Sequence, residues 1–317
     1  MRSPFVCLLL AVILPGLSST AFAQDRLAPL PTRTVAVTFD DLPASGGPGG
    51  LPCDRDRVLD LTDRLLAHLA AQEVPAIGFV NEGRDCEDVV TAVLTRWLDA
   101  GHDLGNHTAT HIDINNVPIA AYLDNIAQGE IITRRLLGAR GRALRYFRHP
   151  YLHAGDTAEK KEAVEAFLAE RGVRIAPVTL DNSEWIFAHA YSIALTRGDM
   201  DAAARIRATY LDWFETVFTH FEAWSLDVLG YEPPQVLLLH ANLLNADAFG
   251  GLAERMKSRG YRFVTLDEAM ADPAYDQPDP YIGEWGISWL HRWARGQGLE
   301  VEWEPDAPDW VNAYRTE

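Results

Sequence analysis

The sequence predicts an α/β fold in which a parallel sheet, closed into a barrel, is covered by helices. Short apolar, β-branched stretches alternate with amphipathic helical stretches from about residue 34 to about residue 270, as repeated βα units do. Polar and ionisable side chains recur where the apolar stretches end, which is typical of a barrel whose site lies at the carboxyl ends of its strands. An open, doubly wound sheet is the alternative.

Seven strands and five helices are expected in this region. The strands are residues 34–38, 76–80, 102–105, 144–147, 173–178, 236–239 and 261–264. The helices are residues 56–71, 89–100, 119–137, 158–170 and 246–258, each with apolar side chains at helical spacing. Pro118 is well placed for the first turn of the third helix, and Gly172 closes the fourth. Residues 186–229 add a largely helical insertion, whose aromatic side chains we expect to form the core of a helical hairpin.

The N-terminus predicts an exported protein. Arg2, an apolar stretch over residues 5–14 and a small-residue cleavage site before Gln24 are typical of a signal peptide over residues 1–23. The apolar stretch is short for a membrane span, and no stop-transfer pattern follows it. We therefore expect a periplasmic or secreted protein without a membrane span. Cys53 and Cys86 remain after cleavage and predict one disulfide, with two separate buried thiols as the alternative.

The charge balance excludes some partners. A formal net charge of −17 without a cluster of Lys and Arg argues against binding to nucleic acid or anionic membranes. For the same reason we expect strongly anionic polymers to bind poorly. The segment 46–50 (Gly-Gly-Pro-Gly-Gly) lacks the Lys-Ser/Thr of a phosphate-binding loop, so it is either a flexible lip of a cleft or a plain surface loop.

Two acidic residues at the end of the first strand, Asp40 and Asp41, carry the strongest chemical signal. His107 and His111 supply two imidazoles four residues apart, on one helix face or on a tight loop, and their Gly and Asn neighbours favour the loop. One carboxylate with two imidazoles is a metal-binding face with open positions for water and substrate. The other carboxylate and His240, which follows a buried strand, are then free to act as base and acid. The plainer alternatives are an acidic turn that caps a helix and a buried core histidine.

Four ordered motifs resemble those of the polysaccharide deacetylases of carbohydrate esterase family four, which have the nodulation-type deacetylase fold. The motifs are Thr38-Phe39-Asp40-Asp41, His107 to His111 with Thr108 after the first His, Arg148-His149-Pro150-Tyr151, and Leu238-Leu239-His240. The resemblance covers about residues 34–270 and implies a distorted (β/α) barrel with fewer than eight repeats. The domains expected are then the signal peptide, a catalytic domain over 24–271 that includes the helical insertion, and a Trp- and Pro-rich extension over 272–317.

The resemblance also implies roles for the site residues. Asp40 is expected to be the general base and His240 the general acid. Asp41, His107 and His111 are expected to bind a divalent metal, for which Zn²⁺ is the ion we expect.

Two further motifs are expected to support these groups. Arg148 orients the general base, and the backbone N–H of Tyr151, next to Pro150, helps to form the oxyanion hole. The family's Asp-x-x-Asp-Trp motif is altered here, because Glu184 replaces the second Asp between Asp181 and Trp185. The change leaves open which acid supports His240 or Arg148, whereas Trp185 is expected to wall the pocket.

The function implied by the resemblance is metal-dependent removal of acetyl groups from an N- or O-acetylated carbohydrate. Hydrolysis of a non-sugar amide on the same fold and a carbohydrate-binding pseudoenzyme are the alternatives. The tail contains Trp285, Trp289, Trp293, Trp303 and Trp310. It either packs against the barrel or forms a wall on which sugars stack.

Overall fold

Strand β1 (Arg33–Leu42) pairs with three other strands of a seven-stranded parallel sheet. It pairs with β6 (Gln235–His240) through residues 35–40. On its other side it pairs with β7 (Tyr261–Val264) through residues 33–36 and with β2 (Ala76–Val80) through residues 37–42. The sheet continues from β2 through β3 (Asp103–Asn106) and β4 (Tyr146–Phe147) to β5 (Arg174–Ile175). All seven predicted strands are confirmed, with shorter fourth and fifth strands.

The segment after β5 joins the two edges of this sheet, so the strands curl into a distorted barrel. The backbone N–H of Ala176 donates to the Phe147 carbonyl of β4 at 2.7 Å, and that of Leu180 donates to the Val236 carbonyl of β6 at 3.0 Å. Leu180 also forms a parallel bridge with Leu237. The predicted barrel with fewer than eight repeats is therefore confirmed, and the open sheet is excluded.

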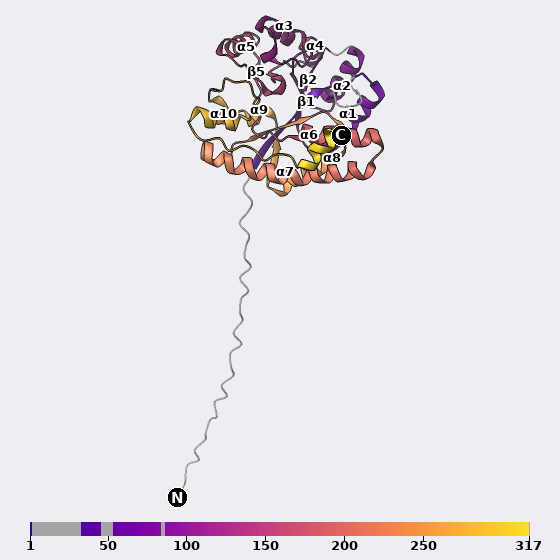
Figure 1. Ribbon diagram of the computed structural model, residues 1–317, viewed down its shortest axis with the longest axis vertical. Coiled ribbons are helices and arrows are strands. Elements are labelled where there is room, and N and C mark those ends of the chain that lie inside the picture. Colours follow the sequence, from indigo (N-terminus) through magenta and orange to yellow (C-terminus); the bar gives the residue numbers. More distant parts are fainter. Residues whose placement is uncertain (2–32, 46–52, 84–85, 317) are drawn as a thin grey trace. The chain divides into compact units, whose positions relative to one another are not determined.

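Helices between the strands cover the barrel (Figure 1). α1 (Arg55–Ala71), α2 (Glu87–Asp99), α5 (Ala158–Glu170) and α8 (Leu243–Ser258) confirm four of the predicted helices. The inserted hairpin is α6 (Glu184–Arg197) and α7 (Met200–Leu229), and Figure 1 shows α7 running along one side of the barrel. The predicted aromatic core of the hairpin is confirmed, because Tyr210, Phe214, Phe218 and Phe221 are fully buried.

The single helix predicted over 119–137 is wrong, because the chain breaks it into α3 (Ile119–Gln128) and α4 (Ile131–Gly138). A Cβ on Gly129 would lie 2.5 Å from the carbonyl carbon of Thr108, so a glycine is required where the two segments touch. The Glu82 carboxylate then accepts from the backbone N–H groups of Ile132 and Thr133, both at 2.6 Å. A buried carboxylate thus caps the new helix start, a pairing between residues 50 positions apart that periodicity does not reveal.

The C-terminal extension contains α10 (Trp289–Gly296) and α11 (Asp309–Thr316), after α9 (Leu266–Ala269) and a 3₁₀ turn (Pro273–Asp276). Trp289 and Trp293 are buried, so packing against the barrel is confirmed for these two side chains. Trp285 and Trp303 remain 71% and 51% exposed and do not belong to the core.

The computed structural model describes residue 1 and residues 33–45, 53–83 and 86–316. The predicted signal peptide after Met1 and the Gly-rich segment 46–50 lie outside these residues. The disulfide between Cys53 and Cys86 is present, with the two Cα atoms 5.5 Å apart. Within the described ranges, no helix is long and apolar enough to cross a membrane.

Candidate active site

The carboxyl ends of β1 and β6 bring Asp40, Asp41 and His240 together. Asp40 and His240 are register partners on neighbouring strands, so their side chains are adjacent although 200 positions separate them in the sequence (240 − 40). Asp41 has a φ of +67°, which turns the chain out of the strand at that residue. Successive side chains on a strand point to opposite faces, and this turn allows both acids to serve one cavity.

Asp41, His107 and His111 form the one cluster of potential metal ligands among the described residues. One ligand atom from each lies within 4.8 Å of the others. The Nε2 atoms of His111 and His107 lie 3.5 Å and 3.9 Å from Oδ1 of Asp41. Ligands about 2.1 Å from a shared tetrahedral ion lie about 3.4 Å apart, so this donor set fits a divalent metal such as Zn²⁺.

A loop carries the two imidazoles, as their neighbours predicted, and two of its residues adopt left-handed backbone conformations. Thr108 has a φ of +67° and His111 a φ of +55°. Asn81 supports the loop, because its side-chain amide donates to the carbonyls of His107 and Thr108 at 2.5 and 3.3 Å. Asn106 accepts from the Thr108 backbone N–H at 2.7 Å. These amide contacts fix the direction of both imidazoles.

The protonation of His107 suits a metal ligand. Its Nδ1 lies 2.8 Å from the carbonyl oxygen of Arg148, which can only accept, so Nδ1 carries the proton and Nε2 keeps its lone pair. Burial lowers the pKa of His107 and of His111 to about 4, although Asp41 opposes the shift. Both rings are therefore neutral at ordinary pH, as metal ligation requires.

Arg148 is fully buried beside Asp40. Its Nη1 donates to Oδ1 of Asp40 at 3.2 Å and to Oγ1 of Thr38 at 3.1 Å, while Nε and Nη2 donate to the carbonyls of Ala176 and Pro177. Burial raises the pKa of Asp40 above its ordinary value, and the guanidinium opposes this shift. Asp40 is thus a fixed carboxylate with more basic character than an exposed one.

Glu184 is the acid that supports His240. The Nδ1–H of His240 donates to the carboxylate of Glu184 at 2.7 Å. Burial lowers the pKa of His240, but the charge of Glu184 and this hydrogen bond outweigh it, and the pKa rises to about 9. The other carboxylate oxygen of Glu184 accepts from Asn242 and Asn245, which compensates its complete burial.

The remaining predicted residues surround this centre. Asp181 and Trp185 line the cavity, but Asp181 makes no direct hydrogen bond to His240 or Arg148 within the described structure. Tyr151 packs edge-on against His111, with ring centroids 4.5 Å apart, and its backbone has a φ of +57°. The buried Pro150 begins the 3₁₀ turn that contains Tyr151 (Pro150–Leu152).

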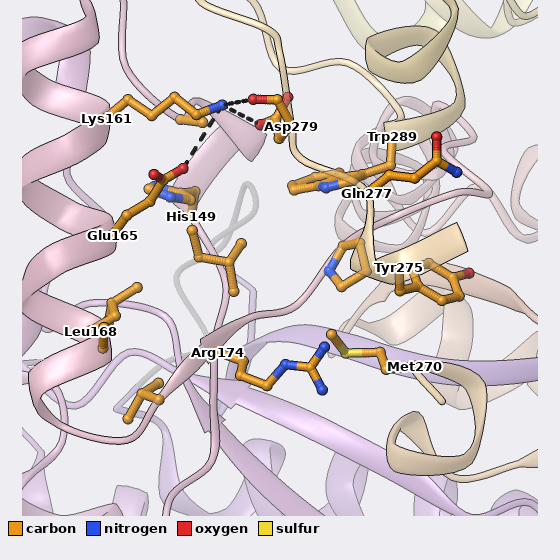
Figure 2. A pocket seen from close by; sticks show the side chains of 15 residues that line it. His149, Lys161, Glu165, Leu168, Arg174, Met270, Tyr275, Gln277, Asp279 and Trp289 are labelled. Atoms are coloured by element: carbon orange, nitrogen blue, oxygen red, sulfur yellow. Dashed lines mark hydrogen bonds and ion pairs between the residues drawn. The ribbon is translucent and has the colours of Figure 1, made fainter. Parts of the chain in front are cut away.

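One open cavity of about 750 Å³ joins these residues. Its lining comprises Asp40, Asp41, Ser45, Gly83, His107, Thr110, His111, Tyr151, Leu152, Asp181, Trp185, Leu238, His240 and Gly286. A second cavity of about 250 Å³ lies between α5 and the C-terminal extension and contains none of the predicted site residues (Figure 2).

The sequence reasoning missed the supporting amides and Gly286. Asn242 caps α8 by accepting from the backbone N–H of Asn245 at 2.9 Å, so the Asn-x-x-Asn spacing after His240 was a detectable helix start. No local pattern indicates that the same two side chains hold Glu184. Gly286 lies outside every motif. It lines the cavity because the C-terminal extension passes next to Tyr151.

Comparison with known proteins agrees with the geometry. The polysaccharide deacetylase family model matches residues 28–166, which contain both acids, both metal-site imidazoles and Arg148. A chitin deacetylase from a Pestalotiopsis species is 28% identical over 155 residues, or 45% of this chain and 46% of that protein. A peptidoglycan-N-acetylglucosamine deacetylase from Bacillus cereus is 25% identical over 251 residues, or 77% and 71%. The match thus spans about half the length of the chitin deacetylase and 71% of the length of the Bacillus cereus protein.

A similar solved structure is that of a mutant of a CE4 family pseudoenzyme from Bacillus anthracis, with a TM-score of 0.50 and 17% identity. The match covers 76% of this chain and 68% of that one, and at this identity it speaks for the fold alone. The barrel places a possible metal site at the carboxyl ends of its parallel strands. Residues 28–166 of the chain are similar to the polysaccharide deacetylases.

Proposed function

We propose that this protein is a metal-dependent deacetylase that hydrolyses the acetyl groups of an N- or O-acetylated carbohydrate outside the cytoplasm. The observation that carries the proposal is the convergence of a buried carboxylate, a three-residue metal site and a carboxylate-paired imidazole on one open cavity. Each part has a separate task in amide or ester hydrolysis, and none is needed for packing alone.

Asp41, His107 and His111 would hold the metal, and Zn²⁺ is the ion we expect there. When bound, such an ion polarises the acetyl carbonyl and lowers the pKa of a bound water. The fit rests on the donor set itself, since both imidazoles are neutral and present Nε2 near one carboxylate oxygen.

The chain's own groups then move the protons. Asp40, held by Arg148, takes a proton from the attacking water as the oxygen bonds to the acetyl carbon. The backbone N–H of Tyr151 donates to the oxyanion that develops. His240 keeps a proton on Nε2 because the Glu184 carboxylate stabilises the imidazolium. His240 donates this proton to the departing nitrogen or oxygen as the C–N or C–O bond breaks. Acetate and the deacetylated sugar are the products.

Acetate release by the mature protein tests the proposal. The protein is stripped with a chelator, reloaded with Zn²⁺, and assayed on N-acetylglucosamine oligomers, peptidoglycan and acetylated xylan. We expect metal-dependent release from one of these classes. Absence of release from all three, with the metal demonstrably bound, would contradict the proposal and favour a non-sugar amide or a binding role.

The Asp40→Asn variant separates an enzyme from a carbohydrate-binding pseudoenzyme. It keeps the size of the side chain and leaves the three metal ligands unchanged. We expect turnover to fall about 10²–10⁴-fold while metal affinity stays near that of the wild type. The pseudoenzyme would be favoured if the wild type releases no acetate and Asp40→Asn binds carbohydrate as tightly as the wild type does.

A further inference from the structure

The turn that carries Tyr151 (Pro150–Leu152) is supported by residues of the C-terminal extension, which lies outside residues 28–166. Tyr151 and Leu152 both have a φ of +57°, a conformation that is costly for non-glycine residues and needs support from its surroundings. That support comes from the C-terminal extension, more than 120 positions later in the chain.

Arg292, in α10, holds the turn through its backbone. The guanidinium is fully buried, and its Nη2 donates to the carbonyl of Leu152 at 2.6 Å. Its Nε donates to the Ile287 carbonyl at 3.0 Å, and its Nη1 donates to Oδ2 of Asp279 at 2.8 Å. The guanidinium also lies 4.0 Å from the ring centroid of Trp289. Every edge of this planar group is therefore engaged in a fixed direction.

An ion pair ties this arginine to the barrel. Asp279 also binds Nζ of Lys161, in α5, at 2.8 Å, and Lys161 donates further to the carbonyls of Asp279 and Tyr281. Figure 2 shows Lys161 and Asp279 facing each other at the edge of the second cavity. A continuous set of charge-assisted contacts thus runs from α5 through Asp279 and Arg292 to the Leu152 carbonyl.

Gly286 constrains the same turn from a second direction. A Cβ placed on Gly286 would lie 1.7 Å from the carbonyl oxygen of Tyr151 and 2.8 Å from its carbonyl carbon. The extension therefore passes directly against the Tyr151 peptide, and any larger residue must displace one of the two backbones. Gly286 itself lines the cavity that contains the candidate site.

We propose that Arg292 and Gly286 are positioning residues that hold the Tyr151–Leu152 turn in the geometry its backbone N–H needs to stabilise the oxyanion. The inference rests on the proposed deacetylase function. A displacement of about 1 Å in such a group costs about 100-fold in rate, whereas substrate and metal contacts elsewhere remain.

Two substitutions test the proposal independently. Arg292→Lys keeps a cation beside Asp279 but removes the planar fork that reaches both carbonyls. Gly286→Ala introduces the Cβ that collides with Tyr151. Arg295→Lys is the matched control, because Arg295 lies one turn further along α10, is exposed and stacks on Tyr281 and Trp303 rather than on the turn.

For each variant, kcat, KM, Zn²⁺ affinity and melting temperature are measured, together with binding of acetate and of a tetrahedral methylphosphonate analogue. We expect kcat to fall about 10–100-fold in Arg292→Lys and Gly286→Ala, with KM, Zn²⁺ affinity and acetate binding within about threefold of wild type. The tetrahedral analogue should lose affinity in parallel with kcat, and the Arg295→Lys control should match wild type.

A merely structural role would lower the melting temperature and leave the ratio of analogue to acetate affinity unchanged. If Arg292→Lys does not fold, Gly286→Ala alone decides. Folded, metal-bound variants with wild-type kcat would overturn the proposal while leaving the deacetylase function intact. A wild-type protein that releases no acetate would instead overturn the function on which the proposal rests.

Discussion

The pairing of Glu184 with His240 sets the pH range in which the candidate acid keeps its proton. Replacing Glu184 by Gln removes the negative charge and the charge-assisted hydrogen bond while keeping a side chain that Asn242 and Asn245 can still contact. Burial is then the largest remaining influence on His240 and disfavours the imidazolium, while the charges of Asp41 and Asp40 still favour it. We expect its pKa to fall from about 9 to about 6.5 or below, because burial disfavours the imidazolium.

The size of the effect follows from these values. A fall of at least about 2 pKa units corresponds to about 3 kcal/mol of lost stabilisation of the imidazolium. At pH 8 the protonated fraction of His240 drops from about 90% to about 3%, so kcat should fall about 30-fold. At pH 5.5 both proteins keep His240 protonated, and the two rates should converge.

The assay is a pH–rate profile of acetate release, checked by NMR titration of the His240 ring. The alkaline limb of the profile should move from near pH 9 to about pH 6.5 in Glu184→Gln. Asp181→Asn is the control, because Asp181 lines the same cavity without a hydrogen bond to His240 and should move the limb much less. An alkaline limb that stays at its wild-type position in Glu184→Gln would refute this account of His240.

The same pair makes folding stability depend on pH. The folded pKa of His240, about 9, lies above its unfolded value near 6.5, so the stabilisation is complete below about pH 6.5 and is lost as the pH rises through 9. The difference in unfolding free energy between wild type and Glu184→Gln should therefore shrink between pH 6 and pH 10. Chemical denaturation at the two pH values measures it.

Three further outcomes are expected. Replacing Cys53 and Cys86 by Ser should lower the unfolding free energy by about 4 kcal/mol for a separation of 33 residues, and equal denaturation midpoints for wild type with and without reductant would contradict this. His111→Gln should weaken Zn²⁺ binding by more than about 100-fold without unfolding the barrel, as calorimetry and circular dichroism can establish. Gly129→Ala should cost about 1–3 kcal/mol because its Cβ meets the backbone of the loop that carries the imidazoles, whereas Gly138→Ala, with nothing within 4 Å, should be tolerated.

Local sequence patterns predicted the strands, and they predicted that the site residues would lie at the carboxyl ends of those strands. Asp40 and His240 each follow an apolar run, and parallel strands end at one rim of a barrel, so their proximity followed from the fold class. The His107–His111 loop was equally accessible, because Gly and Asn beside it disfavour a helix. These predictions needed only neighbouring residues and the topology.

Pairings between distant side chains were not predictable in the same way. Whether Asp181 or Glu184 supports His240 depends on the start of α6, where Ser183 has a φ of +43° and turns Glu184 inward against the amides of α8. The contact of Arg292 with the Leu152 carbonyl spans 140 positions. Such contacts are set by the packing of whole elements, and periodicity carries no signal for them.

The pairing of β1 with strands made much later has a consequence for the order in which the chain can fold. This strand is made first, yet its neighbour β6 begins with Gln235, the partner of Val35, so 200 residues (235 − 35) must follow before that edge is covered. At about 5–20 residues per second the ribosome needs about 10–40 s for this stretch. During that interval an apolar strand ending in two acids has an open edge, which a chaperone or a second nascent chain could occupy. Because β2 can cover only the other edge of β1, productive folding of this barrel depends on keeping the β6-facing edge of the first strand unoccupied until nearly three quarters of the polypeptide has been synthesised.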